Sequence, residues 1–316
     1  MKAFGLADES SPAAVLEIPI PEPGPGEVRI RVHASSVNGY DSFVASGMAR
    51  GMMEHRYPVV VGKDFAGVVD EVGEGVTAFV AGDEVVGITP YEPHLDRGTY
   101  AEFVVVPAEG FIQRKPANLG DGPAASVGLA ALTALVAVDA VEPSDGDVVL
   151  IVGATGGVGS YATQLAAARG ATVIATGLPD DDAWIRQLGA DEVVDYSGDV
   201  PAAVRGRHPE GVDALILAVH LGEALGPTLE LVKDGGRVAS TVGGADDEAL
   251  VARRVSAANV LGQADPGPFA AVVQMAAEGS LTVPITRTYA FEQLPEALGL
   301  VGERRSRGKL AVTIQA

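Results

Sequence analysis

The sequence predicts an α/β protein of two domains, one built mainly of β-strands and the other around a doubly wound parallel sheet. The chain has 316 residues, about twice the usual size of a single domain, and 47% of them are hydrophobic. Its first part shows short strands and turns, whereas the part after Pro123 alternates helices with buried strands. We therefore expect two cores rather than one.

The first domain is predicted over residues 1–121. Apolar and polar side chains alternate from Val28 to Val37, which predicts a strand because successive side chains point to opposite faces of a sheet. Short β-type runs between glycine-containing turns predict four more strands, at 59–61, 67–72, 84–88 and 101–106. This domain is expected to be all-β.

The second domain is predicted over residues 122–265. An Ala- and Leu-rich helix is expected from Ala124 to Val141. Buried strands and helices then alternate, a pattern typical of a parallel sheet. The expected strands are 147–152, 172–176, 192–195, 213–219 and 237–242, and the expected helices are 160–169 and 181–188.

The last segment, residues 266–316, is expected to return and complete the first domain. Its pattern predicts two helices and two strands, in the order helix 269–277, strand 286–291, helix 295–301 and strand 309–314.

Charge and cysteine content limit the possible partners. The chain has 42 acidic and 22 basic residues, and its net charge of −20 repels phosphate backbones and anionic lipid headgroups. Nucleic acid and membrane surfaces are therefore not expected as partners. The absence of cysteine excludes disulfides, thiolate nucleophiles and cysteine-based zinc sites. The chain shows neither a signal-peptide pattern nor an uninterrupted apolar span, so we expect a cytoplasmic protein.

The strongest chemical signal is a glycine-rich turn between a buried strand and a helix. Gly156 lets the backbone approach a pyrophosphate, and Gly159 lets the helix pack close to the strand. The helix N-terminus offers free N–H groups to phosphates. Such glycines also occur in plain tight turns, but the strand before and the helix after favour a dinucleotide site. Its expected residues are Ala154, Thr155, Gly156, Gly157, Val158 and Gly159.

The end of the following strand bears on the choice of cofactor. NAD enzymes usually carry an acidic residue there that binds the adenosine ribose, whereas this chain has Thr176 and Gly177. The missing carboxylate leaves room for a 2′-phosphate, so NADPH is favoured over NADH. The acidic run from Asp180 to Asp182 opposes a further anion, and Arg186 is expected on a solvated helix face. NADH therefore stays an alternative.

Six segments together resemble the medium-chain dehydrogenase/reductase superfamily, within it the zinc-independent quinone oxidoreductase (zeta-crystallin-like) branch. They read SVNGYD (36–41), PVVVGKDFAGVV (58–69), GDEV (82–85), GTYAE (98–102), LTA (132–134) and ATGGVG (154–159). The resemblance covers essentially the whole chain. It implies a GroES-like β-barrel catalytic domain over 1–121, completed by 266–316, and a Rossmann dinucleotide-binding domain over 122–265.

The resemblance also implies a function and an assembly. It implies NADPH-dependent hydride transfer to a small quinone or an α,β-unsaturated carbonyl compound (an enone). A homodimer formed partly by strand pairing around Val260 to Gln263 is implied as well. Thr133 resembles the family threonine beside the nicotinamide ring, with a hydrogen bond to its own helix as the alternative. Val219, Val242 and Gly243 follow later strands at the carboxyl edge and are expected at the cofactor.

Zinc-dependent relatives carry a catalytic Cys where this chain has Asn38 and a His where it has Lys63. Asn and Lys cannot rebuild that site, and the histidines of the chain show no ligand-like spacing. We therefore expect no zinc. Lys63 and Asp64 are expected to pair with each other or with loop groups, in a structural role.

Hydride transfer without a metal needs a hydrogen-bond donor to the substrate carbonyl and a source of a proton. Asn38 is the candidate donor, with closure of a turn as the alternative. Tyr40 is a candidate proton donor, with water as the alternative, because Ser42-Phe43 stands where related reductases often have a tyrosine. Asp41 is the third candidate residue of the catalytic site, and the role favoured for it is to fix the loop by accepting hydrogen bonds.

Two further functions stay open on the same scaffold. One is an enoyl-thioester or biosynthetic tailoring reductase, weakly disfavoured for CoA substrates because the chain shows no basic patch. The other is a non-catalytic NADPH-binding protein.

Overall fold

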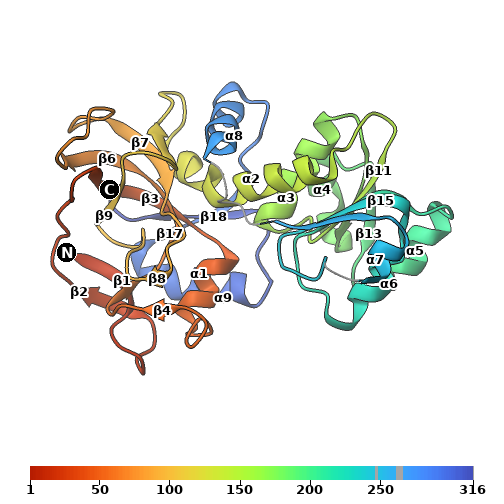
Figure 1. The fold of residues 1–316 in the computed structure, drawn as a ribbon, viewed down its shortest axis with the longest axis horizontal. Helices are drawn as coiled ribbons and strands as arrows, with labels where there is room; N and C mark the ends of the chain where they lie inside the picture. The colour runs from red at the N-terminus through yellow and green to blue at the C-terminus, as the bar shows by residue number, and fades with distance from the viewer. Residues whose placement is uncertain (246–247, 261–265, 316) are drawn as a thin grey trace. The chain divides into compact units, whose positions relative to one another are not determined.

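A computed structural model of the chain describes residues 1–245, 248–260 and 266–315 (Figure 1). The chain divides into two compact units. Unit 1 comprises Met1–Leu129 and Asp265–Ala316, and unit 2 comprises Ala130–Ala264. The C-terminal segment thus belongs to the first unit. The first boundary lies inside helix α2 (Asp121–Val141), rather than at its start.

Unit 1 is built on three β-sheets. The largest has the strand order β10-β7-β6-β3-β18-β17, and β9 also pairs with β3. The other two have the orders β2-β1-β5 and β4-β8. The strands are β1 (Lys2–Leu6), β2 (Ala14–Glu17), β3 (Glu27–Val37), β4 (Glu54–His55), β5 (Val59–Val60), β6 (Asp64–Val72), β7 (Glu84–Ile88), β8 (His94–Leu95), β9 (Phe103–Pro107), β10 (Ile112–Arg114), β17 (Ile285–Ala290) and β18 (Lys309–Thr313).

All five strands predicted for the first domain are present, but the all-β prediction was wrong at one place. Helix α1 (Gly39–Ala45) follows β3 directly. Asn38 is its N-cap residue, and the Asp41 carboxylate accepts a hydrogen bond from the Asn38 backbone N–H at 2.8 Å. This hydrogen bond is one half of a capping box, and it starts a helix that has too few turns to show an apolar period.

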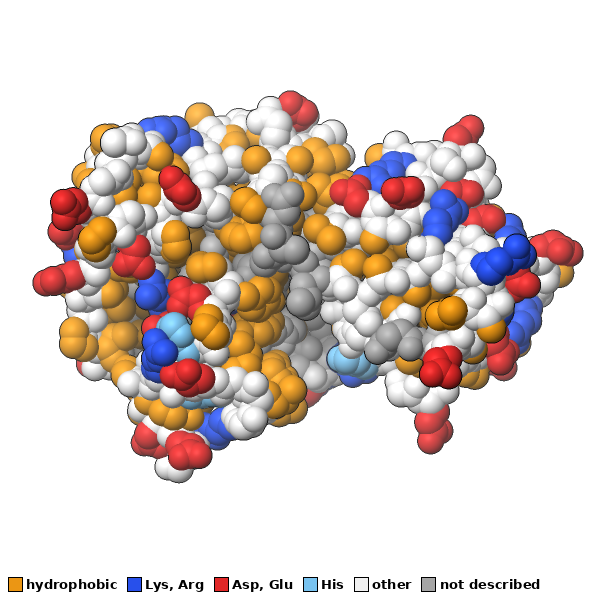
Figure 2. Space-filling model, viewed as in Figure 1, with side chains coloured by type: hydrophobic (Ala, Val, Ile, Leu, Met, Phe, Trp, Pro, Cys, Tyr) orange, Lys and Arg blue, Asp and Glu red, His pale blue; other side chains and the backbone are white. Residues whose placement is uncertain are grey.

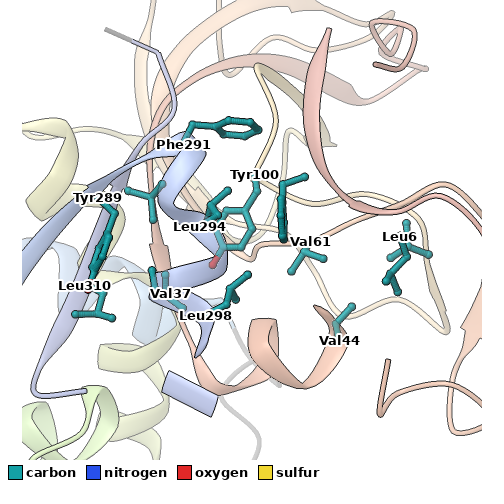
Figure 3. Close-up of a cluster of buried hydrophobic side chains, with 14 of the residues drawn as sticks. Leu6, Val37, Val44, Val61, Tyr100, Tyr289, Phe291, Leu294, Leu298 and Leu310 are labelled. Atoms are coloured by element: carbon teal, nitrogen blue, oxygen red, sulfur yellow. The ribbon is translucent and has the colours of Figure 1, made fainter. Parts of the chain in front are cut away.

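The C-terminal segment completes the core of unit 1, as predicted. Strand β18 pairs antiparallel with β3. In Figure 1, β18 is drawn in blue and β3 in red-orange. Helix α9 (Leu294–Gly302) packs on α1, and Ser42 Oγ donates to the Leu298 carbonyl at 2.9 Å. Figure 3 shows the apolar cluster that results, with side chains from both ends of the chain, among them Leu6, Val37, Val44, Val61, Tyr100, Tyr289, Phe291, Leu294, Leu298 and Leu310. Helices α8 (Gly267–Glu278) and η3 (Phe291–Gln293) complete the segment.

Unit 2 is a parallel sheet with the strand order β13-β12-β11-β14-β15-β16, which is the doubly wound arrangement predicted. All five strand pairs are parallel. The strands are β11 (Val148–Val152), β12 (Thr172–Gly177), β13 (Glu192–Asp195), β14 (Val212–Leu217), β15 (Val232–Ser240) and β16 (Ser256–Asn259). The helices are α3 (Gly157–Ala168), η1 (Pro179–Asp181), α4 (Asp182–Gln187), α5 (Val200–Arg207), η2 (Gly222–Ala224), α6 (Leu225–Leu229) and α7 (Glu248–Ala252).

Helix α2 is long and apolar enough to cross a membrane by length and composition alone. However, 78% of its most apolar stretch is buried inside the protein, as expected for a core helix. The helix is kinked at Gly128, whose dihedral angles (φ −23°, ψ −115°) are not helical. At the kink, the Leu129 backbone N–H donates to Asp64 Oδ1 at 2.7 Å, so a side chain replaces the usual carbonyl partner.

The kink predicts a specific intolerance to a side chain at residue 128. A Cβ atom there would overlap Asp64 Oδ1, a carboxylate held in a buried network. We expect Gly128→Ala to lower the free energy of unfolding by about 1–3 kcal/mol, as overpacking of a core does. Urea unfolding would measure it.

Gly206→Ala in α5 is the matched control. Nothing lies within 4 Å of a Cβ at that position, so this variant should be neutral or stabilised by up to about 1 kcal/mol. Equal stabilities of the two variants would contradict the role assigned to the kink.

Candidate functional site

The glycine turn of unit 2 has the geometry of a phosphate site. β11 ends at Val152, and α3 starts at Gly157 with Gly156 as its N-cap residue. The glycine N-cap provides no side chain to occupy the N–H groups of the first helical turn, so they are open to an anion. A Cβ at Gly159 would overlap the Gly153 carbonyl, whereas a Cβ at Gly156 meets only that oxygen, at 3.4 Å. Gly159 therefore serves packing, and Gly156 leaves space beside the turn.

The other predicted cofactor residues of the turn lie in the same place. Ala154 is buried, while Thr155, Gly157 and Val158 are partly exposed. Val219 follows β14 and packs against the turn, since its Cγ1 atom lies 3.1 Å from a Cβ built on Gly153. These residues meet where β11 and β14 adjoin, the point at which the strand order reverses and ligands of such sheets bind.

The end of β12 supports the glycine turn through a side-chain hydrogen bond and through packing. The Thr176 hydroxyl accepts a hydrogen bond from the Gly153 N–H at 3.0 Å, so it braces the turn from the neighbouring strand. Gly177 is buried against Ile185 and the Asp181 side chain. Arg186 pairs with Asp182 at 2.9 Å, so its guanidinium is engaged on its own helix.

Three predicted cofactor residues lie outside the turn and β12. β15 ends at Ser240, earlier than predicted, so Val242 and Gly243 lie in the turn after the strand. Val242 is partly buried and Gly243 is exposed. Thr133 lies on α2 and is 9% exposed.

In unit 1, two of the three predicted catalytic residues, Asn38 and Asp41, belong to a buried polar network around Asp64, whereas Tyr40 lies outside it. Asp64 Oδ2 accepts hydrogen bonds from Ser36 Oγ at 2.5 Å and from Asn38 Nδ2 at 2.8 Å. Lys309 Nζ lies 3.5 Å from the same oxygen. The side chains of Asp64 and Lys309 are 0% and 1% exposed. Such a pair is stable only when its remaining hydrogen bonds are made.

Lys309 supplies the positive charge of this network. Its ammonium group also donates to the Val37 carbonyl at 3.2 Å and to Asn38 Oδ1 at 2.7 Å, so all three of its donors are used. Burial lowers the pKa of Lys309, and Asp64 and Asp41 oppose that shift by stabilising the cation.

Asn38 lies at the centre of the same network. Its Nδ2 donates to Asp64 and also to Asp41 Oδ2 at 3.2 Å, while its Oδ1 accepts from Lys309. Both amide hydrogens are thus directed at carboxylates. Donation to a substrate carbonyl would require one of these hydrogen bonds to break.

Asp41 fixes the start of α1, as predicted. Besides the two bonds from Asn38, its Oδ2 accepts from the Tyr100 hydroxyl at 3.1 Å. Its Oδ1 is fully buried and has no hydrogen-bond partner in the described part of the chain. Burial and the nearby charge of Asp64 raise the pKa of Asp41 to about 7.

Lys63 does not pair with Asp64. Its ammonium group donates to the Pro90 carbonyl at 2.7 Å, which is the loop contact that the sequence left as the other possibility. The same atom lies 4.3 Å from the ring centre of Tyr91 and 5.5 Å from that of Tyr40. The two rings meet edge to face, with 5.1 Å between their centres. Tyr40 directs its hydroxyl to Met53 Sδ at 3.6 Å.

A small, partly open cavity of about 30 Å³ lies beside these side chains in unit 1. Its lining includes Tyr40, Asp41 and Lys63 from the predicted site region. The segment after β7, which includes β8, contributes Pro90, Glu92, His94, Asp96 and Arg97 to the lining. On the face seen in Figure 2, acidic and basic side chains are interspersed rather than gathered in one basic patch.

Glu92, His94 and Asp96 are close enough together to hold a metal ion. Arg56 Nη1 lies 3.2 Å from His94 Nε2, and Arg97 Nε lies 3.5 Å from Asp96. These two guanidinium groups already supply positive charge to the cluster, so we assign no metal to it.

Sequence reasoning missed two central residues, Asp64 as the hub of the network and Lys309 as its cation. The available signal was a lysine at the start of an apolar strand, since Lys309 opens β18 and the apolar residues 310–312 follow it. A lysine in such a strand is buried only with a partner, but nothing local identifies that partner.

Comparisons with known proteins agree with this architecture. Residues 24–116 match the family model described as the alcohol dehydrogenase GroES-like domain, and residues 188–312 match the model described as zinc-binding dehydrogenase. The curated relatives matched first are covered by the chain over 45–62% of their own length.

Three solved structures are similar over nearly the whole chain. A quinone oxidoreductase from Coxiella burnetii has a TM-score of 0.88 and 30% identity, covering 100% of this chain and 99% of that one. An NAD-dependent alcohol dehydrogenase has a TM-score of 0.86 and 32% identity, with 100% of both chains covered. A mycobacterial protein complexed with NADPH has a TM-score of 0.85 and 26% identity, with 99% of both chains covered.

The raised pKa of Asp41 predicts a pH dependence of stability. Its pKa rises from 3.8 to about 7 on folding. Between these values the folded protein keeps a proton that the unfolded chain has lost, so the free energy of unfolding falls as pH rises. The limiting slope is about 1.4 kcal/mol per pH unit. Asp41→Asn removes this contribution, so its stability relative to the original protein should rise from pH 4 to pH 7.

Urea unfolding at a series of pH values would test this, with the exposed Glu210→Gln as control. Parallel profiles of Asp41→Asn and the original protein would show that Asp41 does not carry the effect.

Proposed function

Because the chain belongs to the medium-chain dehydrogenase/reductase superfamily and is quinone oxidoreductase-like, we propose that it is an NADPH-dependent, zinc-independent reductase of quinones or enones. The observation that carries the proposal is the glycine turn of unit 2, placed between β11 and α3 where the strand order reverses. An oxidoreductase of this superfamily uses a pyridine nucleotide. When bound, this cofactor supplies a hydride to an electron-poor carbon of the substrate.

The residues of the turn would hold the cofactor in defined ways. The first N–H groups of α3, at Gly157 and Val158, would bind the pyrophosphate, and Gly156 would let it approach. Gly177 and the residues after β12 would lie near the adenosine ribose, while Val219, Val242 and Thr133 would bound the rest of the site.

The choice of NADPH rests on the end of β12. No carboxylate of β12 itself stands where NAD-specific sheets present one, because Thr176 and Gly177 are buried there. The pairing of Arg186 with Asp182 weakens the case for NADPH, since the nearest basic side chain is already engaged. The ratio of kcat/KM for NADPH and NADH therefore decides this part of the proposal, and a preference for NADH would overturn it.

The proposal of zinc independence rests on the chemistry of the side chains present. Asn38 and Lys63 stand at the two positions where zinc-dependent relatives have ligands. Both are engaged in other contacts: Asn38 with Asp64, Asp41 and Lys309, and Lys63 with the Pro90 carbonyl. An amide and an ammonium do not form a zinc site. These residues do not fit the metal, and we assign it no step.

Turnover is tested by NADPH oxidation with 1,4-benzoquinone, 9,10-phenanthrenequinone and crotonyl-CoA. We expect oxidation with at least one of the quinones. Preference for crotonyl-CoA would favour an enoyl-thioester reductase instead, and tight NADPH binding without turnover would favour a non-catalytic nucleotide-binding protein.

A variant of the turn tests where the cofactor binds. In Gly156→Ala the added methyl group finds ordinary space in the protein but projects toward the proposed pyrophosphate. We expect NADPH affinity to fall at least about 10-fold, which corresponds to about 1.4 kcal/mol, with little change in Tm. The control is Gly226→Ala in α6, where a Cβ meets nothing within 4 Å. Fluorescence titration would measure both, and equal affinities would contradict the assignment.

We also propose that the chain forms a homodimer through the edge of the unit 2 sheet. β16 is the last strand in the order, and Ser256, Ala257 and Asn259 on it are exposed. Of the predicted contact segment, residues 261–263 lie outside the described residues, while Val260 pairs within its own sheet through a hydrogen bond to Ser240.

For this dimer we expect a mass of about 64 kDa, twice the 32.2 kDa of the chain, by size-exclusion chromatography with light scattering. Ala257→Pro should shift the protein toward 32.2 kDa, because proline removes a donor from the edge strand. A monomer in the unmodified protein at all concentrations would disprove the dimer.

A further inference from the structure

We propose that Lys63 is the catalytic proton donor to the carbonyl oxygen of the substrate, acting in the cavity that it shares with Tyr40 and Asp41. The inference rests on the proposed reductase function and deepens it by assigning the source of the proton. It differs from the sequence-based expectation, in which Tyr40 or water had that role.

The position of Lys63 leaves part of its donor capacity unused. The side chain is 6% exposed, and its ammonium group is held by the Pro90 carbonyl and by the rings of Tyr91 and Tyr40. A lysine ammonium has three N–H donors, and in the described part of the chain only one of them has a hydrogen-bond acceptor. Two N–H groups therefore remain for a ligand.

Asp41 lines the same cavity as Lys63. Its Oδ1 atom is buried and has no hydrogen-bond partner in the described residues. A buried polar atom without a partner costs about 1–3 kcal/mol. A substrate oxygen that accepts from Lys63 would use one of its two remaining N–H donors. The cavity of about 30 Å³ has room for one such oxygen, since a water molecule occupies about 30 Å³ in the liquid.

Tyr40 is the weaker donor in this arrangement. Its hydroxyl points to Met53 Sδ, and burial together with the charge of Asp41 raises its pKa to about 12. Burial lowers the pKa of Lys63 to about 8, although the carboxylates of Asp41, Asp64 and Glu92 oppose that shift. General acids work best with a pKa near the operating pH, which favours Lys63.

Asp41 is the nearby carboxylate whose charge affects the Lys63 ammonium group most, because the other carboxylates around it already have partners. Asp64 is paired with Lys309, and Glu92 and Asp96 both contact His94. A proton on Asp41 leaves the charge of Lys63 uncompensated, which stabilises negative charge on the substrate oxygen. The charged and titratable groups that face Lys63 or line its cavity are Tyr40, Asp41, Asp64, Tyr91, Glu92, His94, Asp96 and Arg97.

The bound cofactor would supply a hydride to the β-carbon of an enone or to a ring carbon of a quinone, and the displaced π electrons would then reside on the carbonyl oxygen near Lys63. The N–H bond of Lys63 breaks as the O–H bond forms on that oxygen, which gives an enol. From an enone this enol tautomerises to the saturated ketone. From a quinone it becomes the hydroquinone when the ring carbon that received the hydride releases a proton to water and the second carbonyl oxygen takes one up. Neutral Lys63 then regains a proton from water. One substrate, one NADPH and one proton give the reduced product and NADP⁺.

Binding without turnover provides the first test, with 4-nitrophenol as an oxyanion probe. Its absorbance distinguishes phenol from phenolate, so both affinity and ionisation are measured in the absence of NADPH. We expect the phenolate to bind, with affinity falling at least about 10-fold in Lys63→Gln, which lacks the charge. Lys63→Arg should keep most of the binding. The control Lys233→Gln removes a lysine that pairs with Asp213 in unit 2 and should change nothing.

Measurements of kcat distinguish two roles of Lys63, donation of a proton to the substrate oxygen and electrostatic binding of that oxygen. Arginine keeps the charge but does not release a proton, so both Lys63→Arg and Lys63→Gln should lose about 100-fold in kcat with 2-cyclohexenone. The loss should be smaller with 1,4-benzoquinone, whose reduced anion is more stable. With the enone, kcat of the original protein should fall as pH rises through about 8, and that limb should be absent in Lys63→Arg.

Failure of the proposed function and failure of the role of Lys63 give different results. Absence of turnover by the original protein with every quinone and enone would overturn the proposed function and the proton-donor role with it. Full turnover by Lys63→Arg with the pH limb intact would overturn only the role of Lys63. Melting curves identify a variant that has not folded, and if Lys63→Gln unfolds, Lys63→Arg decides.

Discussion

The buried carboxylate of Asp64 is the constraint on which the arrangement of unit 1 depends. Its oxygens receive hydrogen bonds from Ser36 and Asn38 next to the end of β3, from the Leu129 N–H at the kink of α2, and from Lys309 on β18. An unpartnered carboxylate would cost several kcal/mol at such a depth. The network therefore joins β3, β6, β18 and α2 around one charge, and the glycine at the kink is needed to let the backbone reach it.

The same network sets the electrostatics beside the proposed substrate cavity. Two carboxylates, Asp41 and Asp64, share one buried ammonium group, that of Lys309, and Asp64 lies nearer to it. Asp41 is left with a raised pKa and one unpartnered oxygen, close to Lys63. The network is therefore satisfied at Asp64 and incomplete at Asp41.

Local pattern was enough to predict much of the architecture. The glycine turn, the parallel sheet and the return of the C-terminal segment follow from apolar periods and turn residues, which act over a few positions. Helix α1 was missed because its seven residues show no apolar period, although Asn38 and Asp41 carry its capping signal. The Asp64–Lys309 pair could not be predicted, because its two members are 245 positions apart and neither side chain marks the other.

The 245 positions between Asp64 and Lys309 affect the order in which unit 1 can fold during translation. Asp41 and Asp64 leave the ribosome early, and the strand that brings their positive partner is synthesised some 245 residues after Asp64. Until Lys309 arrives, β3 lacks its neighbour β18 and the two acids lack their counter-ion. The N-terminal half of unit 1 must therefore wait for the whole of unit 2 to be translated, and chaperone contact during that interval would fall on exposed β3.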